Sequence, residues 1–260
     1  MLNQNRADLT LSPTLCVVFA TLGRFVTTER RAMDGPVPGS LLAMLSAAES
    51  ALVLGGGVRR VFGVDEVLVR EGDPPDFVHI VIAGWVRVST VGADGDEVLF
   101  ALRGPGDVVG ESAVLLGEAR GANVRAVGRV VVVQVPGAVF LDLAATRPGV
   151  GLALARGMAV RLREADAVRV DMATLDVTRQ VAGYLLRLLR VYGVRSVDGR
   201  GIDLPLTQQD VANHLGASLR QVSRSLAVLR ERGAVVTGRK RLTVAEPDLL
   251  AALVDGIPAT

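Results

Sequence analysis

The sequence predicts an α+β protein that joins an N-terminal antiparallel β-roll, a long helix and a C-terminal winged helix-turn-helix. Three observations lead to this prediction. Residues 58–135 are short apolar or alternating runs divided by turn residues, a pattern typical of an antiparallel barrel or roll. No proline lies between Pro148 and Pro205, and apolar residues recur there at helical spacing. Beyond Leu204, capping and turn residues follow at the short intervals of a helix pair.

Length and composition indicate a folded chain of two domains. With 260 residues, the chain can bury two separate cores. Its hydrophobic fraction of 50% and charged fraction of 22% are those of a globular protein. The single cysteine, Cys16, excludes an internal disulfide and fits a reducing cytoplasm. The apolar run 15–22 is too short to span a bilayer, so we expect a cytoplasmic protein without membrane contact.

We expect four segments along the chain. Residues 1–40 form an N-terminal extension, expected to be disordered, whose first part precedes a second methionine at Met33. Residues 41–150 form the β-roll domain, 151–190 the dimerisation helix and hinge, and 191–260 the winged helix-turn-helix.

The positive charge is concentrated in the C-terminal part of the chain. Between Arg179 and Arg241 there are twelve basic residues against four acids, although the whole chain has a net charge of only +2. A basic end on an otherwise acidic chain indicates contact with a polyanion. Solvated surface charge is the alternative.

Turn residues define the expected roll. Asp94-Gly95 lies between two apolar runs and predicts a hairpin with a tight type I′ turn, because both residues tolerate positive φ. Four glycines are expected at the corners of the roll: Gly72, Gly84, Gly104 and Gly106.

The long helix carries a heptad seam. Met158, Leu162, Ala165 and Met172 follow it, with Arg169 in the remaining position. A helix this long on a small domain usually packs on a partner, most often its own copy, so these five residues are the predicted dimer interface. The alternative is a helix lying across the β-roll of its own chain.

Two short helices with a turn between them are predicted next. Thr207 and Asp210 have the spacing of a capping box, and Ser218 is placed to cap the second helix after a turn at Gly216. Their inner faces are Val211, Ala212 and Leu215, then Val222, Leu226 and Leu229. The segment 234–244 then forms a β-hairpin, or wing, with a basic tip.

The outer face of the second helix suits DNA. Arg220 and Arg224 lie one turn apart on it, and arginine can make two hydrogen bonds to guanine, while Gln221 suits adenine. Basic residues on the wing suit phosphates, among them Arg241. The predicted DNA-binding residues are Thr207, Gln208, Ser218, Arg220, Gln221, Ser223, Arg224, Arg239 and Lys240.

Catalytic chemistry has little support in the sequence. His79 and His214 are the only histidines, so neither a catalytic triad nor a transition-metal cluster is easy to assemble. We expect both to be packing or surface residues and expect neither an enzyme nor a bound metal. The alternative, a cupin-like metalloenzyme, needs several ligands converging on the roll.

Glu111 and Arg120 bracket a small, apolar stretch between residues 110 and 126. A carboxylate accepts from hydroxyl groups and a guanidinium suits phosphate oxygens, so the pair could form two halves of one site. A plain salt bridge between them is the alternative.

Several motifs in order resemble the Crp/Fnr family of bacterial transcription regulators, over residues 41–244. "GDVVGES" with "RGANVRA" resembles its phosphate-binding cassette, "LDVT" its hinge, and "LTQQDVANHLGASLRQVSRSLAVLRERG" its DNA-reading helices. The resemblance implies that Glu111 takes a ribose hydroxyl and that Arg120 takes a phosphate. The implied ligand-binding residues are Gly110, Glu111, Ser112, Arg120, Gly121, Ala122 and Asp166.

The chain departs from the family pattern at the base-reading side. Gly121 stands where a Ser or Thr usually adds a phosphate contact, and Ala165 and Asp166 replace the Thr and Ser that read adenine. Aspartate would accept from a donor-rich edge such as that of guanine, or pair with Arg169. Leu219-Arg220 replaces a base-reading Arg-Glu pair, so the half-site should differ.

The resemblance therefore implies a homodimer that binds a palindromic operator in double-stranded DNA, with RNA polymerase as a further partner. Its β-roll would sense a nucleotide second messenger, and occupancy would reposition the recognition helices. No cofactor is obligatory; cyclic AMP or cyclic GMP is the expected effector. The alternatives are a cyclic dinucleotide and ligand-independent DNA binding.

Overall fold

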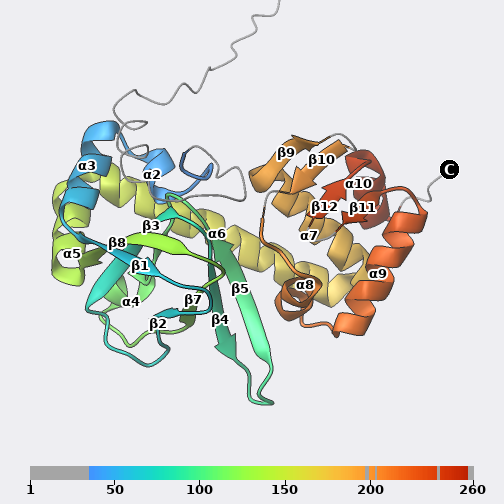
Figure 1. The fold of residues 1–260 in the computed structure, drawn as a ribbon, viewed down its shortest axis with the longest axis horizontal. Helices are drawn as coiled ribbons and strands as arrows, with labels where there is room; N and C mark the ends of the chain where they lie inside the picture. The colour runs from blue at the N-terminus through green and yellow to red at the C-terminus, as the bar shows by residue number, and fades with distance from the viewer. Residues whose placement is uncertain (1–34, 197–198, 203, 239–240, 257–260) are drawn as a thin grey trace, which may run out of the picture.

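The fold is described from a computed structural model. It describes residues 35–196, 199–202, 204–238 and 241–256. Cys16, Met33 and the predicted wing-tip residues Arg239 and Lys240 lie outside the described residues. Figure 1 shows two units joined by a long helix, which is the α+β architecture that the sequence predicts.

The N-terminal unit is a roll of two antiparallel sheets. One four-stranded sheet has the order β1-β8-β3-β6 and the other the order β2-β7-β4-β5. The strands are β1 (Val58–Phe62), β2 (Val67–Val69), β3 (Phe77–Ala83), β4 (Val86–Val91), β5 (Glu97–Arg103), β6 (Val108–Val109), β7 (Asn123–Ala126) and β8 (Val130–Pro136). Since the sheets face each other, side chains of alternate residues fill the interior of the roll.

Strand β8 shows why its sequence is a continuous run of valine. Val130 and Val132 point into the roll, where they pack with Val81, whereas Val131 and Val133 point to the opposite face. Both faces are buried, so the alternation of apolar and polar residues expected of a half-exposed strand is lost. Helices cover the outer face: α2 (Leu41–Met44), α3 (Ala47–Gly55), α5 (Gly137–Thr146) and α6 (Pro148–Thr174).

Strands β4 and β5 form a hairpin that extends beyond the roll (Figure 1). The predicted hairpin is confirmed, but the predicted type I′ turn is wrong. The amide of Gly95 donates to the carbonyl of Gly92 at 3.0 Å, and Gly95 has φ +86° while Asp94 is not among the residues with positive φ. The loop between β4 and β5 is therefore longer than the two residues of a type I′ hairpin, and Gly95 is its left-handed residue.

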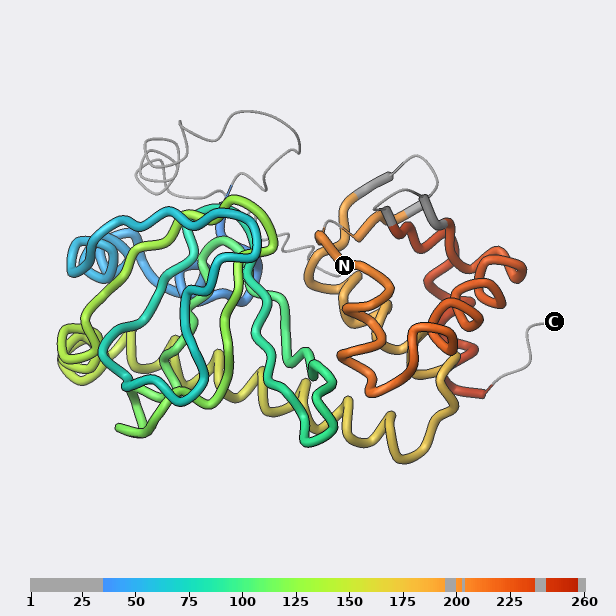
Figure 2. Tube along the Cα trace, turned by 60° about the horizontal axis from the view of Figure 1, so that its bottom comes forward, coloured from blue at the N-terminus to red at the C-terminus, as the bar shows by residue number. Residues whose placement is uncertain are grey.

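Helix α6 carries the chain from the roll to the C-terminal unit (Figures 1 and 2). It begins with Pro148 in its first turn and ends before Leu175, which is extended. Asp176 then caps α7 (Val177–Tyr192) by accepting from the amide of Arg179 at 3.0 Å. Of the described helices none alone is long and apolar enough to cross a membrane; α5 and α6 meet that test only together, bent by 105°.

The described residues from Val177 to Gly256 form one packed unit, called the reader unit below. Its core joins α7 to α8 (Gln208–Leu215), α9 (Leu219–Glu231) and α10 (Pro247–Asp255). A small sheet of order β11-β12-β10-β9 covers it, with β9 (Gly193–Ser196), β10 (Gly199–Ile202), β11 (Val235–Gly238) and β12 (Arg241–Val244).

Packing places α7 in the reader unit, whereas the sequence assigns 177–190 to the dimerisation segment. Val181, Leu185 and Leu189 are buried in the same core as the two predicted helices. Their spacing places these side chains on one face of α7, and this face packs in the core of the reader unit. The packed C-terminal unit therefore begins after the break between α6 and α7, while the domain boundary at 190/191 stays a prediction.

Both predicted helix starts are confirmed. In α8, the Thr207 hydroxyl accepts from the Asp210 amide while the Asp210 carboxylate accepts from the Thr207 amide. Ser218 and Gln221 form the same reciprocal pair in α9. Gly216, with φ +60°, ends α8 in the left-handed region, so only a short turn separates the two helices.

Candidate effector and DNA-binding sites

The predicted cassette has a backbone that only glycine adopts without strain. Gly110 has φ +84° and joins β6 to α4 (Glu111–Leu116). A Cβ at this position would lie 2.8 Å from Nη1 of Arg120. The glycine therefore permits both the turn and the close approach of the arginine.

Arg120 is buried, with 3% of its surface exposed. Its Nη1 donates to the Gly110 carbonyl at 2.7 Å and its Nη2 to the Phe77 carbonyl at 2.6 Å. Its guanidinium carbon lies 4.8 Å from the centre of the Phe77 ring, and its Nε has no partner among the described residues. Burial lowers the pKa of Arg120, and the carboxylates of Asp76 and Asp73 oppose this shift.

Glu111 is paired with the long helix rather than with Arg120. Its carboxylate, also buried, accepts a short hydrogen bond from Nη1 of Arg161 on α6. Nη2 of the same arginine donates to the Val108 carbonyl at 3.1 Å. The alternative of a salt bridge between Glu111 and Arg120 is therefore not what the fold forms.

The two residues face different cavities. Glu111 lines a cavity between the roll, α6 and the end of α7, together with Asp107, Arg161 and Tyr192. Burial raises the pKa of Asp107, although nearby Arg103 and the Gly104 amide act in the opposite direction. Arg120 lines a second cavity, with Arg70, Asp73 and Phe77 among its walls. The two predicted site residues thus line different cavities, although Arg120 binds the carbonyl of Gly110, the residue before Glu111.

The interior of the roll beside Arg120 is filled by rings. His79 is 1% exposed, and its ring lies 4.7 Å from that of Phe77 and 5.7 Å from that of Phe62. Burial lowers the pKa of His79 to about 4, although Gln134 opposes the shift. The prediction that this histidine packs in the protein is confirmed.

The remaining predicted ligand residues beyond Gly110 are more accessible to solvent than Glu111 and Arg120. Ser112 and Gly121 are exposed and Ala122 is half-buried. Asp166 is exposed on α6 and accepts from Arg169 at 3.1 Å, which is the pairing that their spacing allows. A Cβ added at Gly121 would meet no atom within 4 Å, so a serine could be accommodated there.

Sequence reasoning missed Arg161 and Phe77. Arg161 lies one helical turn before Ala165, but no local pattern distinguishes it from the other arginines of α6. Phe77 supplies a carbonyl and a ring, and a carbonyl leaves no trace in the sequence. Only the fold brings these groups to Arg120 and Glu111.

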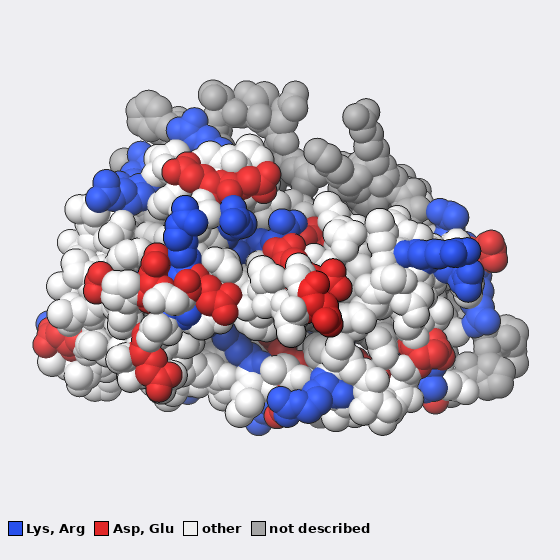
Figure 3. Space-filling model, turned by 90° about the horizontal axis from the view of Figure 1, so that it is seen from below, with Lys and Arg blue, Asp and Glu red and all other residues white. Residues whose placement is uncertain are grey.

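The predicted DNA-reading residues of α9 lie on its exposed side. Arg220, Ser223 and Arg224 are exposed, while Val222 and Leu226 are buried against the other helices. The two arginines are four positions apart, so their guanidinium groups project from one side of the helix. Arginines gather at the end of the molecule where α9 lies (Figures 1 and 3).

Polar neighbours hold this face in place. The Gln221 side chain accepts from the Ser218 amide and hydroxyl, so it is engaged in the helix cap and less free to read adenine. Ser223 donates to the Gln208 side chain at 2.7 Å, which joins α9 to α8. The Thr207 hydroxyl is engaged with Asp210.

No cluster of three or more His, Cys, Asp or Glu side chains in the described ranges could hold a metal ion. The part of the chain that the structure describes thus contains no ligand set of the kind that the cupin-like alternative needs.

Comparisons with known proteins match both units. Residues 59–147 match the cyclic nucleotide-binding domain, and residues 179–253 match the Crp-like helix-turn-helix domain. The cyclic AMP receptor protein of Thermus thermophilus is 31% identical over 214 residues, which are 82% of this chain and 95% of that protein. The CRP-like cAMP-activated global transcriptional regulator of Mycobacterium tuberculosis is 29% identical over 181 residues, 70% of this chain and 81% of that protein. The structure of FixK2 from Bradyrhizobium japonicum has a TM-score of 0.66 and 25% identity, covering 78% of this chain and 98% of that chain.

The β-roll, the long helix and the capped helix pair define a two-unit DNA-binding regulator of transcription. More specifically, the chain belongs to the Crp/Fnr family. Members of this family regulate transcription and are not classed as enzymes.

Proposed function

We propose that the protein is a homodimeric regulator whose recognition helices read a palindromic operator and whose β-roll senses a nucleotide second messenger. The observation that supports this most directly is α9, a helix that begins with a capping box and exposes Arg220 and Arg224 on one side. A twofold dimer would present two such helices about one DNA turn apart. RNA polymerase is the further partner proposed for the DNA-bound dimer.

The exposed side of α6 supports the dimer. Leu162 is 63% exposed and Met172 46%, although both are large and apolar. The monomer leaves this seam in water, and a second copy of the helix would bury it.

Arg120 supports a nucleotide effector. A buried guanidinium with one unpartnered nitrogen can exchange backbone carbonyls for phosphate oxygens. The relatives from Thermus and Mycobacterium carry cyclic AMP in their names. Here the Ala165 side chain has no hydrogen-bonding group, and the Asp166 carboxylate is an acceptor. We therefore propose as effectors both cyclic AMP and the guanine-containing nucleotides cyclic GMP and cyclic di-GMP.

A second candidate is ligand-independent DNA binding. Arg120 and Glu111 both have partners from the chain itself, and the roll interior between Phe62 and Phe77 is filled by His79. A nucleotide would have to displace these contacts. A protein without an effector would keep them.

Calorimetric titration of the purified protein with cyclic AMP, cyclic GMP and cyclic di-GMP separates the two candidates. If the effector is a nucleotide, we expect saturable heat with one of them and at least about tenfold weaker binding for Arg120→Ala, because a charge-assisted phosphate contact is lost. Gly121→Ser should bind more tightly, since its hydroxyl adds a donor in open space. Arg129→Ala, which removes an exposed arginine of the roll, is the control.

The outcome decides between the candidates. Absence of heat with all three nucleotides, for a protein that still binds DNA, would favour ligand-independent binding. Unchanged affinity of Arg120→Ala would exclude Arg120 as the phosphate ligand.

DNA reading is tested with duplexes selected by the protein from a randomised library. We expect Arg224→Ala to lose about tenfold or more in affinity and to relax the base preference at one position of each half-site, because a bidentate base contact is lost. Arg156→Ala removes the same charge from the exposed surface of α6 and should bind like the unchanged protein. Equal losses of DNA affinity in both variants would show that Arg224 contributes only through its charge and not through a base contact.

A further inference from the structure

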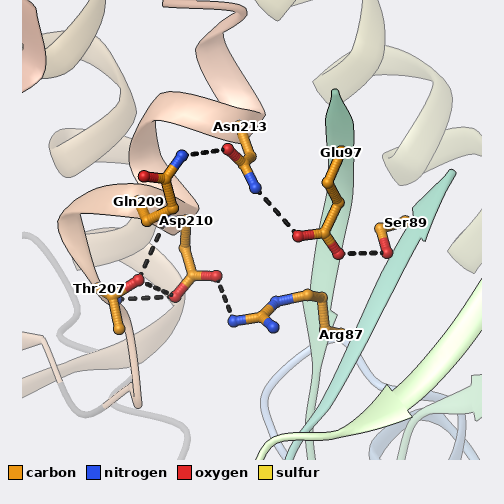
Figure 4. A network of polar contacts seen from close by, with 7 residues as sticks. All are labelled: Arg87, Ser89, Glu97, Thr207, Gln209, Asp210 and Asn213. Atoms are coloured by element: carbon orange, nitrogen blue, oxygen red, sulfur yellow. Dashed lines mark hydrogen bonds and ion pairs between the residues drawn. The ribbon is translucent and has the colours of Figure 1, made fainter. Parts of the chain in front are cut away.

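The β4–β5 hairpin of the roll contacts α8 of the reader unit through three polar links. Arg87 pairs with Asp210 at 2.5 Å, and Asn213 donates to Glu97 at 3.0 Å. Nδ1 of His214 lies 3.0 Å from the Leu99 carbonyl. Figures 1 and 2 both show the hairpin beside α6 and α8, and Figure 4 shows the two links between side chains. This set of contacts is called the hairpin contact below.

Asp210 has two tasks in the hairpin contact. One carboxylate oxygen accepts from the amide and hydroxyl of Thr207, which begins α8, and the other accepts from Arg87. The Asp210 side chain is only 2% exposed, so Arg87 supplies the opposite charge that burial requires. The start of the first reading helix is therefore stabilised by a residue of the roll.

Glu97 and Leu99 add links along the edge of the sheet. Ser89 donates to one oxygen of Glu97 at 2.7 Å, which leaves the other oxygen directed at Asn213. Strand β5 is at a sheet edge, where backbone groups on one side lack a strand partner. The Leu99 carbonyl finds a partner in His214, which must donate from Nδ1 because a carbonyl only accepts.

The contact is anchored on both sides. The His214 ring is stacked on Tyr184 of α7, with 4.2 Å between the ring centres. At the base of the hairpin, Trp85 meets Tyr192 edge-to-face at 5.4 Å and packs on the core of the reader unit. The first contact fixes His214 within the reader unit, and the second ties the base of the hairpin to α7.

The hairpin contact leaves the DNA-reading face free, because Arg220 and Arg224 remain exposed while it is formed. Along the chain, the extended Leu175 and the cap residue Asp176 join α6 to the reader unit, and Arg187 of α7 pairs with Asp171 of α6 at 2.5 Å beside this joint. The hairpin contact adds a lateral link on α8, and contacts at two separate places fix an orientation better than contacts at the joint alone.

We propose that the β4–β5 hairpin is a second docking surface between the roll and the reader unit, with α8 as its occupant, and that it presets the orientation in which α9 meets DNA. The inference rests on the proposed DNA-reading function. It assigns the roll a direct path to the reading helices in addition to the path through α6. A change in the roll that moved the hairpin would move α8 with it.

The double variant Arg87→Ala/Glu97→Ala tests this in the full-length protein. Both substitutions lie in the roll, outside the two cavities described above and outside the DNA-reading face. The matched control is Arg129→Ala/Asp142→Ala, which removes one exposed arginine and one exposed acid of the roll and leaves the net charge equally unchanged.

Amide hydrogen exchange is read in peptides from α8, where no residue is substituted. We expect exchange in α8 to become about tenfold faster in the double variant and to stay unchanged in the control. Affinity for the selected duplexes should fall about threefold to tenfold, because the reader unit must then be oriented on binding.

Unchanged exchange in α8 would overturn the docking surface. Faster exchange with unchanged or tighter DNA binding would overturn its role in presetting α9. Failure of the unchanged protein to bind any selected duplex would instead overturn the proposed function, while the exchange measurement would still report on the contact itself.

Discussion

Arg120 keeps its charge inside the roll because two carbonyl oxygens and the face of Phe77 replace the water that burial removes. Gly110 makes this arrangement possible, since a side chain there would collide with the guanidinium. The arginine proposed to bind phosphate thus also links Gly110 to strand β3. An effector would have to compete with these internal hydrogen bonds.

Glu111 illustrates the same competition on the other side of the cassette. Its buried carboxylate needs a positive partner, and Arg161 of α6 provides one. Any ligand hydroxyl that approaches Glu111 meets a carboxylate already paired with the long helix. Occupancy at Glu111 would therefore be transmitted directly to α6.

His79 makes the stability of the roll dependent on pH. Its pKa in the fold is about 4, below the ordinary value of 6.5, because burial disfavours the imidazolium. The unfolded chain therefore binds a proton at higher pH than the folded chain does, and folding stability falls as the pH drops from 6.5 towards 4.

His79→Leu should remove this dependence. We expect the unchanged protein to lose about 2 kcal/mol more than the variant between about pH 7.5 and pH 5, measured as the free energy of unfolding in urea. His214, whose pKa burial also lowers, remains in both proteins and cancels in the comparison. If the free energies of unfolding of the two proteins changed in parallel with pH, His79 would be protonated in the folded protein without loss of stability.

At the scale of elements, α6 has two different sides. Val150, Ala153 and Leu154 are buried against the roll, whereas Leu162 and Met172 are exposed further along the helix. The first part therefore belongs to the core of the roll. The second part is the surface that the proposed dimer would cover.

Leu162→Glu should weaken self-association, because a charge without a partner would be buried in the seam. We expect the unchanged protein to sediment as a dimer and the variant to have a dimer dissociation constant at least about tenfold higher. Arg163→Glu makes a larger change of charge beside the seam and should retain the dimer. A dimer of unchanged affinity in Leu162→Glu would place the interface elsewhere.

Helix α8 has a capping residue that also serves long-range packing. Asp210 caps the helix through Thr207, an interaction set by three positions of sequence, and receives Arg87 from the roll. Substitution of Asp210 would therefore change the helix start and the hairpin contact together. Arg87 and Glu97 are better probes because their substitution leaves the residues of the Thr207–Asp210 capping box unchanged.

At the scale of the whole molecule, the roll and the reader unit are joined twice, through α6 and through the hairpin contact. The two paths start from different parts of the roll. Glu111 reaches α6 through Arg161, whereas the sheet that contains β4 and β5 reaches α8 directly. The roll therefore contacts the C-terminal part of the chain at more than one place.

The sequence by itself determined the elements whose signals are local. The Thr207–Asp210 capping box, the cap at Ser218, the hairpin and the buried face of α9 depend on residues a few positions apart, and each was predicted. The type of the hairpin turn was not, because Asp94 tolerates positive φ without requiring it. The packing of α7 in the reader unit has no such local signal, because the residues that its apolar face contacts include ones that are distant in the sequence.

Only the tertiary structure decided which groups meet. Glu111 is paired with Arg161, 50 positions away, instead of Arg120, and Arg87 is paired with Asp210, 123 positions away. A buried charge takes whichever opposite charge or carbonyl the packed elements bring within hydrogen-bond distance, and such long-range proximity has no periodic signal in the chain. The kinds of groups at the candidate site were therefore predictable, whereas their division between two cavities was decided by packing.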